Sequence, residues 1–199
     1  MIRAGLLLVL LGLTSLAAGA TENAVRERLS ELRERHGFPG ATLAWTGPEG
    51  PMQAVAVGLA DPDQEKPMTP DTRMLSASIG KSFVAAAALT AVENDQLDLD
   101  APISQWLGER DWFERLPNHE TLTLRHLLTH TGGLPDHVYL RAFQTLFRKS
   151  ATAVNPPTPE ELIGLILDRE PLFPPGEGWA YSDTGYLLAA RVLEAATGQ

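Results

Sequence analysis

The pattern of apolar and polar positions predicts a short sheet-forming start followed by a long helical region. Residues 21–36 have the spacing of an amphipathic helix, with Gly37 as its C-cap. One face of that helix carries Val25, Leu29, Leu32 and His36. Residues 41–47 and 52–61 have the character of two strands, and the Gly-Pro-Glu-Gly-Pro turn between them predicts a β-hairpin.

From about Met74 the pattern changes to helices separated by loops. Residues 61–71 form a polar connector, and residues 79–94 are alanine-rich and strongly favour a helix. Residues 83–87 have the pattern of a buried helix segment. Boundary signals mark the later helices: Thr123 before 124–130, the capping box Thr158 to Glu161, and Gly198 after a last helix that begins at Thr184 or Gly185.

A sheet-forming start followed by helices predicts the α+β class. Two strands alone are marginally stable in water, so we expect this hairpin to need partner strands that the chain does not supply. Within one incomplete domain spanning 21–199, we expect residues 21–72 to form the helix and hairpin. Residues 73–199 are then expected to form the helical region.

The first twenty residues have the pattern of a signal peptide. Arg3 precedes an apolar run from Leu6 to Leu16, and Ala18-Gly19-Ala20 has the small-x-small form of a cleavage site. The alternative is a single membrane anchor, but the run is short for a spanning helix of about 20 residues. We therefore expect cleavage, a periplasmic or secreted protein, and no stable membrane insertion.

Charge and cysteine content exclude several function classes. The chain has a net charge of −9, and removal of residues 1–20 takes away Arg3 and no acid, leaving −10. A strongly acidic protein is repelled by nucleic acid and by anionic lipid. Without cysteine, there are neither disulfides nor a thiol nucleophile. We expect no cofactor.

The segment SASIGKSF, residues 76–83, fits two kinds of site. Gly80-Lys81-Ser82 matches the end of a phosphate-binding loop, but that loop needs a leading glycine where this chain has Leu75. Ser78 and Lys81 instead share one helical face. A lysine with a lowered pKa can take the proton of a serine hydroxyl, and a helix N-terminus favours the negative charge that develops. The alternative is a solvated Lys81 on a helix capped by Ser76 or Ser78.

A second polar cluster, Tyr181-Ser182-Asp183, follows a proline-glycine loop and precedes a helix. A tyrosine beside a lysine-activated serine can share the proton transfer. Alternatively, Tyr181 packs under the loop while Ser182 or Asp183 caps the helix.

Three histidines could form a zinc site, but the sequence favours this interpretation only weakly. His126 and His130 are four residues apart, with His137 as a possible third ligand. Leu127 replaces the glutamate that would follow His126 in a metalloprotease motif, and His130 lies at a helix exit. We therefore expect no metal and a His130 that hydrogen-bonds the loop.

Three blocks together resemble the class C-like branch of the serine β-lactamase and penicillin-binding-protein superfamily. They are residues 74–107, 121–137 and 171–198. The resemblance implies the β-lactamase/transpeptidase-like fold, an antiparallel sheet with helices. It also implies that Ser78 is the acylated nucleophile, Lys81 its base and Tyr181 the proton-relay tyrosine. The substrate would be a β-lactam, a D-amino-acid or peptidoglycan peptide, or a short-chain ester.

The chain departs from this superfamily at two places. Asp183, expected to bind substrate, replaces the usual asparagine, and a carboxylate can pair with Lys81 and raise its pKa. The carboxylate at Asp183 therefore favours an ester or peptide substrate over a β-lactam. The chain also stops at Gln199, before the downstream Lys/His-x-Gly strand. We therefore expect an N-terminal fragment that is inactive alone. The alternative function is a non-catalytic protein of this fold that binds peptidoglycan or a partner.

Overall fold

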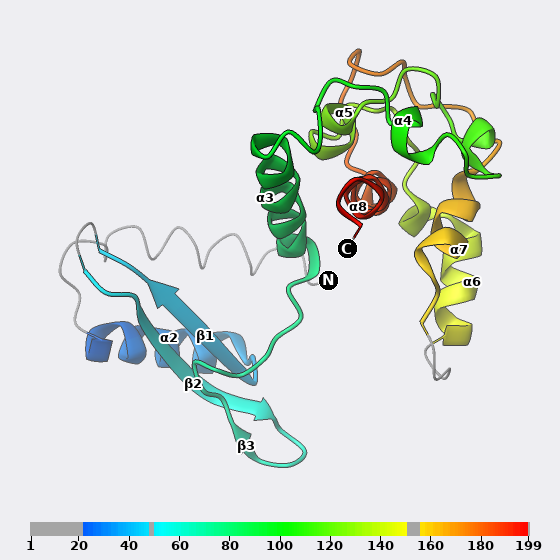
Figure 1. Cartoon of the computed structure of the whole chain (residues 1–199). Helices are drawn as coiled ribbons and strands as arrows, with labels where there is room; N and C mark the ends of the chain where they lie inside the picture. The colour runs from blue at the N-terminus through cyan, green and yellow to red at the C-terminus, as the bar shows by residue number, and fades with distance from the viewer. Residues whose placement is uncertain (1–21, 48–49, 151–155, 199) are drawn as a thin grey trace. The chain divides into compact units, whose positions relative to one another are not determined.

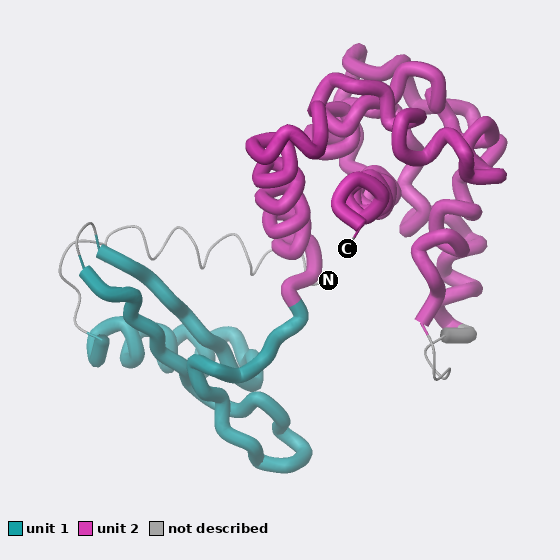
Figure 2. The backbone as a smooth tube through the Cα atoms, viewed as in Figure 1, with its two compact units in different colours: residues 1–75 teal, residues 76–199 magenta. Residues whose placement is uncertain are grey.

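The computed structural model describes residues 22–47, 50–150 and 156–198. The predicted signal peptide, residues 1–20, lies outside them. The chain divides into two compact units, residues 1–75 and 76–199 (Figure 2). Among the described helices, none combines the length and the apolar character needed to cross a membrane.

The first unit is a helix packed on a small antiparallel sheet (Figure 1). Its elements are α2 (Glu22–His36), β1 (Gly40–Trp45), β2 (Gln53–Asp61) and β3 (Lys66–Pro67). The core between helix and sheet consists of Val25, Leu29, Val55 and Val57. The predicted helix face is confirmed except for His36, which is exposed because it is the last residue of α2.

The predicted hairpin is present, with β1 antiparallel to β2 and Gly40 opposite Gly58. Glycine is required here because a Cβ on Gly58 would lie 2.2 Å from the Pro39 carbonyl oxygen, and φ at Gly58 is +76°. The connector was predicted without a strand, but Lys66–Pro67 pairs with the end of β2 as β3. Two residues are too few for a hydrophobic pattern to indicate a strand.

The second unit is helical and is built around its last helix. Its elements are η1 (Ala77–Ile79), α3 (Gly80–Glu93), α4 (Ser104–Leu107), η2 (Phe113–Arg115), α5 (Leu124–Leu128), η3 (His137–Tyr139), α6 (Arg141–Ser150), α7 (Pro159–Ile163), η4 (Gly164–Ile166) and α8 (Asp183–Thr197). In Figure 1, α8 is seen end-on between α3 and α7, with α5 and α4 above it. α8 contacts all four of these helices.

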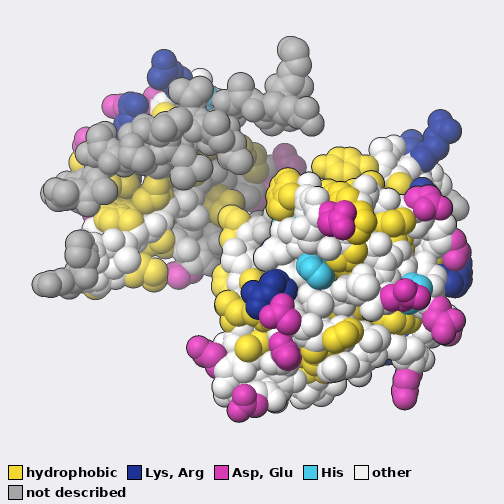
Figure 3. Space-filling view, turned by 90° about the horizontal axis from the view of Figure 1, so that it is seen from above, with side chains coloured by type: hydrophobic (Ala, Val, Ile, Leu, Met, Phe, Trp, Pro, Cys, Tyr) yellow, Lys and Arg dark blue, Asp and Glu magenta, His cyan; other side chains and the backbone are white. Residues whose placement is uncertain are grey.

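Buried leucines, isoleucines and valines from these helices form one core. α8 contributes Leu188, Ala189 and Val192, none of which is accessible to solvent. Gly198, in the left-handed conformation with φ +72°, ends α8 as predicted. Acidic side chains are spread over the face shown in Figure 3 and do not gather into one patch.

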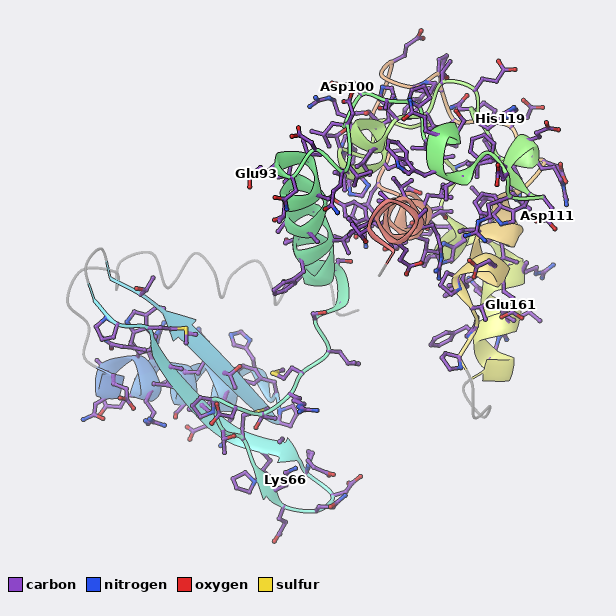
Figure 4. All side chains as sticks on the ribbon, in the orientation of Figure 1. Lys66, Glu93, Asp100, Asp111, His119 and Glu161 are labelled. Atoms are coloured by element: carbon purple, nitrogen blue, oxygen red, sulfur yellow. The ribbon has the colours of Figure 1, made fainter. Side chains whose placement is uncertain are left out.

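Several boundary predictions are confirmed, while one packing prediction is wrong and one helix was missed. Thr123 caps α5, and Thr158 and Glu161 form the capping box of α7; Figure 4 labels Glu161 on that helix. The segment 83–87 was predicted to be buried, but Phe83 is 70 % exposed because only one side of α3 packs on α8. Helix α6 was not predicted.

Replacement of Leu188 by alanine should lower the free energy of unfolding by about 2–5 kcal/mol, since it leaves a cavity beneath α8. Urea unfolding followed by circular dichroism measures this. Leu89→Ala is the matched control, because Leu89 is 50 % exposed on α3; its effect should stay within about 0.5 kcal/mol. Equal losses for the two variants would contradict the central position of α8.

Candidate active site

Ser78 lies in the short 3₁₀ turn η1, directly before α3, and its side chain is exposed. The preceding residue, Ala77, has φ +45°, an unusual conformation for a residue with a Cβ. Neither Ser76 nor Ser78 caps the helix with its side chain, so that alternative is wrong. The amides of Ile79 and Gly80 donate to carbonyls within the turn. They are therefore not the free donors expected at a helix N-terminus.

Lys81, in the first turn of α3, reaches back to Ser78 as the spacing predicts. Its Nζ donates to Ser78 Oγ over 3.5 Å. The same ammonium forms an ion pair with Asp183 at the start of α8. The Lys81 side chain is 17 % exposed, so it is not the solvated surface lysine of the alternative interpretation.

The loop that leads to Tyr181 is tied by main-chain hydrogen bonds to the turn after α5. The amides of Leu172, Gly176 and Ala180 donate to carbonyl oxygens of the 130–133 turn at 2.8, 2.8 and 3.0 Å. Asn118 joins the same two segments, since its Nδ2 donates to the carbonyls of Gly132 and Phe173. The two segments approach so closely that a Cβ on Gly133 would lie 1.9 Å from the Phe173 oxygen.

Tyr181 emerges from this loop and meets Ser78. Its Oη donates to Ser78 Oγ at 2.8 Å, across 103 residues of sequence. Its ring lies 4.5 Å, centre to centre, from the ring of His130 in the turn after α5. Ser182 is the N-cap of α8, with its Oγ accepting from the Gly185 amide at 3.1 Å. Asp183 is therefore the first helical residue and not the cap.

The four residues Ser78, Lys81, Tyr181 and Asp183 thus lie together within the second unit. Lys81 Nζ also lies 4.9 Å from the centre of the Tyr181 ring and 5.6 Å from that of Tyr186. Burial lowers the pKa of Lys81, but hydrogen bonding and charge attraction to Asp183 and Tyr181 outweigh it, so the pKa lies above the ordinary value. Lys81 is therefore an ammonium at neutral pH.

The histidines have separate hydrogen-bonding partners. His126 Nδ1 faces the Thr123 N–H and hydroxyl, His130 Nδ1 accepts from the Ser182 amide at 3.2 Å, and His137 Nδ1 lies 2.8 Å from Thr184 Oγ1. In the described part of the chain, no three His, Cys, Asp or Glu side chains are grouped to hold a metal ion.

Tyr186 is a residue of this cluster that the sequence pattern did not indicate. Its Oη donates to the Leu128 carbonyl at 2.9 Å, which ties α8 to α5, and burial raises its pKa. Its spacing from Tyr181 spans the loop-to-helix junction, so neither helical nor strand periodicity marks the two tyrosines as neighbours.

Comparison with known proteins identifies the family. The family model described as Beta-lactamase matches residues 25–199. The chain belongs to the beta-lactamase family. Its three-stranded antiparallel sheet and helices follow the β-lactamase/transpeptidase-like fold.

Curated relatives include a penicillin-binding protein and an esterase. The chain is 31% identical over 169 residues to penicillin-binding protein 4* of Bacillus subtilis, covering 84% of this chain and 34% of that protein. It is 36% identical over 149 residues to esterase EstB of Burkholderia gladioli, covering 72% and 37%. The chain therefore spans about a third of the length of these relatives.

Solved structures with this fold include enzymes named for D-amino-acid chemistry. The D-stereospecific amidohydrolase from Streptomyces matches with a TM-score of 0.72 at 28% identity, covering 90% of this chain and 51% of that one. The D-amino acid amidase from Ochrobactrum anthropi, in complex with L-phenylalanine, matches with a TM-score of 0.71 at 28% identity, covering 90% and 46%. An esterase and an amidase are thus among the proteins that the chain resembles.

Replacement of Asp183 by asparagine should lower the pKa of Lys81, because it removes the negative partner of the ammonium. The chain has three lysines, so NMR of ¹³Cε-labelled lysine can follow each titration separately. Asp100→Asn, which breaks the exposed Asp100–Arg125 pair, is the matched control and should leave the Lys81 signal unchanged. A Lys81 pKa that is the same in Asp183→Asn and the unaltered chain would contradict the ion pair.

Proposed function

We propose that the protein is an exported hydrolase that acts through an acyl-enzyme, with Ser78 as nucleophile, Lys81 as base and Tyr181 as proton relay. The proposal rests on two hydrogen bonds to Ser78 Oγ, one from Tyr181 Oη at 2.8 Å and one from Lys81 Nζ at 3.5 Å. A serine hydroxyl is a weak nucleophile until a neighbouring group takes its proton. Both groups that can do so lie within reach of the same oxygen.

In the proposed reaction, Ser78 Oγ bonds to the acyl carbon while its proton passes to the Lys81–Tyr181 pair. The pair then protonates the leaving amine or alkoxide as the acyl bond breaks. Water next attacks the acyl-enzyme, gives its proton to the pair, and releases the acid as Ser78 recovers a proton. The resting site holds an ammonium on Lys81, so one proton must leave the pair before the first step.

The proposed substrates are D-amino-acid peptides or amides, short-chain esters, or β-lactams. Relatives named as an esterase and as a D-amino acid amidase support the first two classes. Asp183 supports them as well, because a carboxylate only accepts hydrogen bonds, whereas the asparagine amide usual in this family also donates to a substrate carbonyl. The proposed location outside the cytoplasm rests on the pattern of residues 1–20.

Ser78 should take up the acyl group of an activated short-chain ester such as p-nitrophenyl acetate, and Ser78→Ala should abolish the adduct. Intact-mass spectrometry of the full-length protein detects it, and peptide mapping places it. Ser82→Ala is the matched control, since this exposed serine lies one residue beyond Lys81; it should leave labelling unchanged. An adduct that persists in Ser78→Ala would contradict the assignment of Ser78 as the nucleophile. No adduct in the unaltered protein would favour a non-catalytic binding protein.

The rate of this labelling should rise with pH, because the raised pKa of Lys81 keeps the base protonated at neutral pH. Asp183→Asn should move the rise to lower pH and speed labelling at pH 7, by about tenfold for each unit by which the Lys81 pKa falls. Stopped-flow release of p-nitrophenol measures the profile. A rise that stays at the same pH in Asp183→Asn would show that the Lys81 charge does not control the nucleophile.

A further inference from the structure

His130 contacts both residues that flank Tyr181. Its carbonyl oxygen accepts from the Ala180 amide at 3.0 Å, and its Nδ1 accepts from the Ser182 amide at 3.2 Å. The chain on either side of Tyr181 is thus fixed by one residue. No other histidine in the described ranges makes such a pair of contacts with this loop.

The ring of His130 also supports the side chain of Tyr181. Its centre lies 4.5 Å from the Tyr181 ring centre with a 33° tilt, 5.2 Å from that of Tyr186, and 6.0 Å edge-on from that of Trp179. The imidazole therefore lies among the aromatic side chains that surround the proposed relay.

The backbone of His130 adopts a conformation that most side chains avoid. Its φ is +60°, in the left-handed region where histidine, asparagine and aspartate are enriched among residues with a Cβ. The Thr131 amide, bonded to the His126 carbonyl at 3.0 Å, helps to hold this turn at the exit of α5. This conformation aims the imidazole at the loop.

We propose that His130 is a positioning residue that holds the Tyr181 phenol against Ser78 while its imidazole is neutral. Nδ1 can accept from the Ser182 amide only as a neutral nitrogen, and protonation turns it into a donor that faces another donor. The proposal rests on the proposed function, in which Tyr181 relays the proton.

The surroundings of the ring favour the neutral form. The titratable groups around it are Lys81 on α3, Asp136 before η3, Tyr181 in the loop, Asp183 and Tyr186 on α8, and His126 on α5. Burial lowers the pKa of His130 and the positive charge of Lys81 lowers it further, while Asp183 and Asp136 act in the opposite direction without offsetting these effects. At neutral pH, His130 therefore supports Tyr181, and acid should release it.

The test uses ¹³Cζ-labelled tyrosine in the 199-residue chain, which has three tyrosines, and assigns the Tyr181 signal with Tyr181→Phe. We expect that signal to change as pH falls below about 6.5, together with the His130 ring signals. His130→Asn keeps the left-handed backbone and places an amide oxygen where Nδ1 was, so its Tyr181 signal should no longer respond to pH in this range. His130→Gly keeps the backbone alone and should shift the Tyr181 signal at every pH.

Labelling of Ser78 at pH 8 gives the second readout. His130→Gly should slow it by about 10- to 100-fold through misplacement of Tyr181, whereas His130→Asn should restore most of the rate. His36→Asn, an exposed histidine of α2, is the matched control and should change neither readout. If His130→Gly fails to fold, the loss of the pH response in His130→Asn still tests the proposal.

Two outcomes of the Tyr181 measurement overturn the inference. One is a Tyr181 signal that ignores the titration of His130, and the other is a pH response that persists in His130→Asn. If Ser78 takes no label while the Tyr181 signal behaves as expected, the positioning role stands and the proposed hydrolase function fails. If Ser78 is labelled at equal rates in both His130 variants, the hydrolase function stands and the positioning role fails.

Discussion

The main-chain hydrogen bonds between the 130–133 turn and the loop before α8 determine the geometry of the site. Each such bond contributes only about 0.5–1.5 kcal/mol to stability. Together they align a loop that has no regular secondary structure of its own, from the Leu172 amide to the Ala180 amide. Tyr181 follows directly, so its distance to Ser78 depends on how α5 ends as much as on η1, the turn that carries Ser78.

The ion pair between Lys81 and Asp183 then sets the charge of the site. It joins the first turn of α3 to the first turn of α8, and these two helices also pack against each other. The same contact that fixes the Lys81 ammonium near Ser78 holds its proton. The carboxylate therefore positions the proposed base but also keeps it protonated. A site that holds its lysine through a carboxylate must work at higher pH than one that uses an amide.

The sequence predicted the features that depend on local chemistry. The hairpin, the caps at Thr123 and Thr158, and the i, i+3 contact of Ser78 with Lys81 follow from turn residues, capping side chains and helical spacing. The burial of residues 83–87 in α3 was predicted wrongly, because an apolar run does not say how many neighbours a helix has. A hydrogen bond from His130 to a loop was predicted, but not that its partners flank Tyr181. Those contacts join positions about fifty residues apart, one through His130 Nδ1 and one between main-chain groups.

Asp183 shows how one position can satisfy two demands. As the first residue of α8, its negative charge lies at the positive end of the helix dipole, an arrangement worth about 0.3–1 kcal/mol. The same charge raises the pKa of Lys81. An asparagine here would free the lysine but give up the favourable charge at the start of the central helix. Because α8 carries the core residues Leu188, Ala189 and Val192, the carboxylate supports the helix around which the second unit is built. It does so at the expense of the unprotonated fraction of Lys81 at neutral pH.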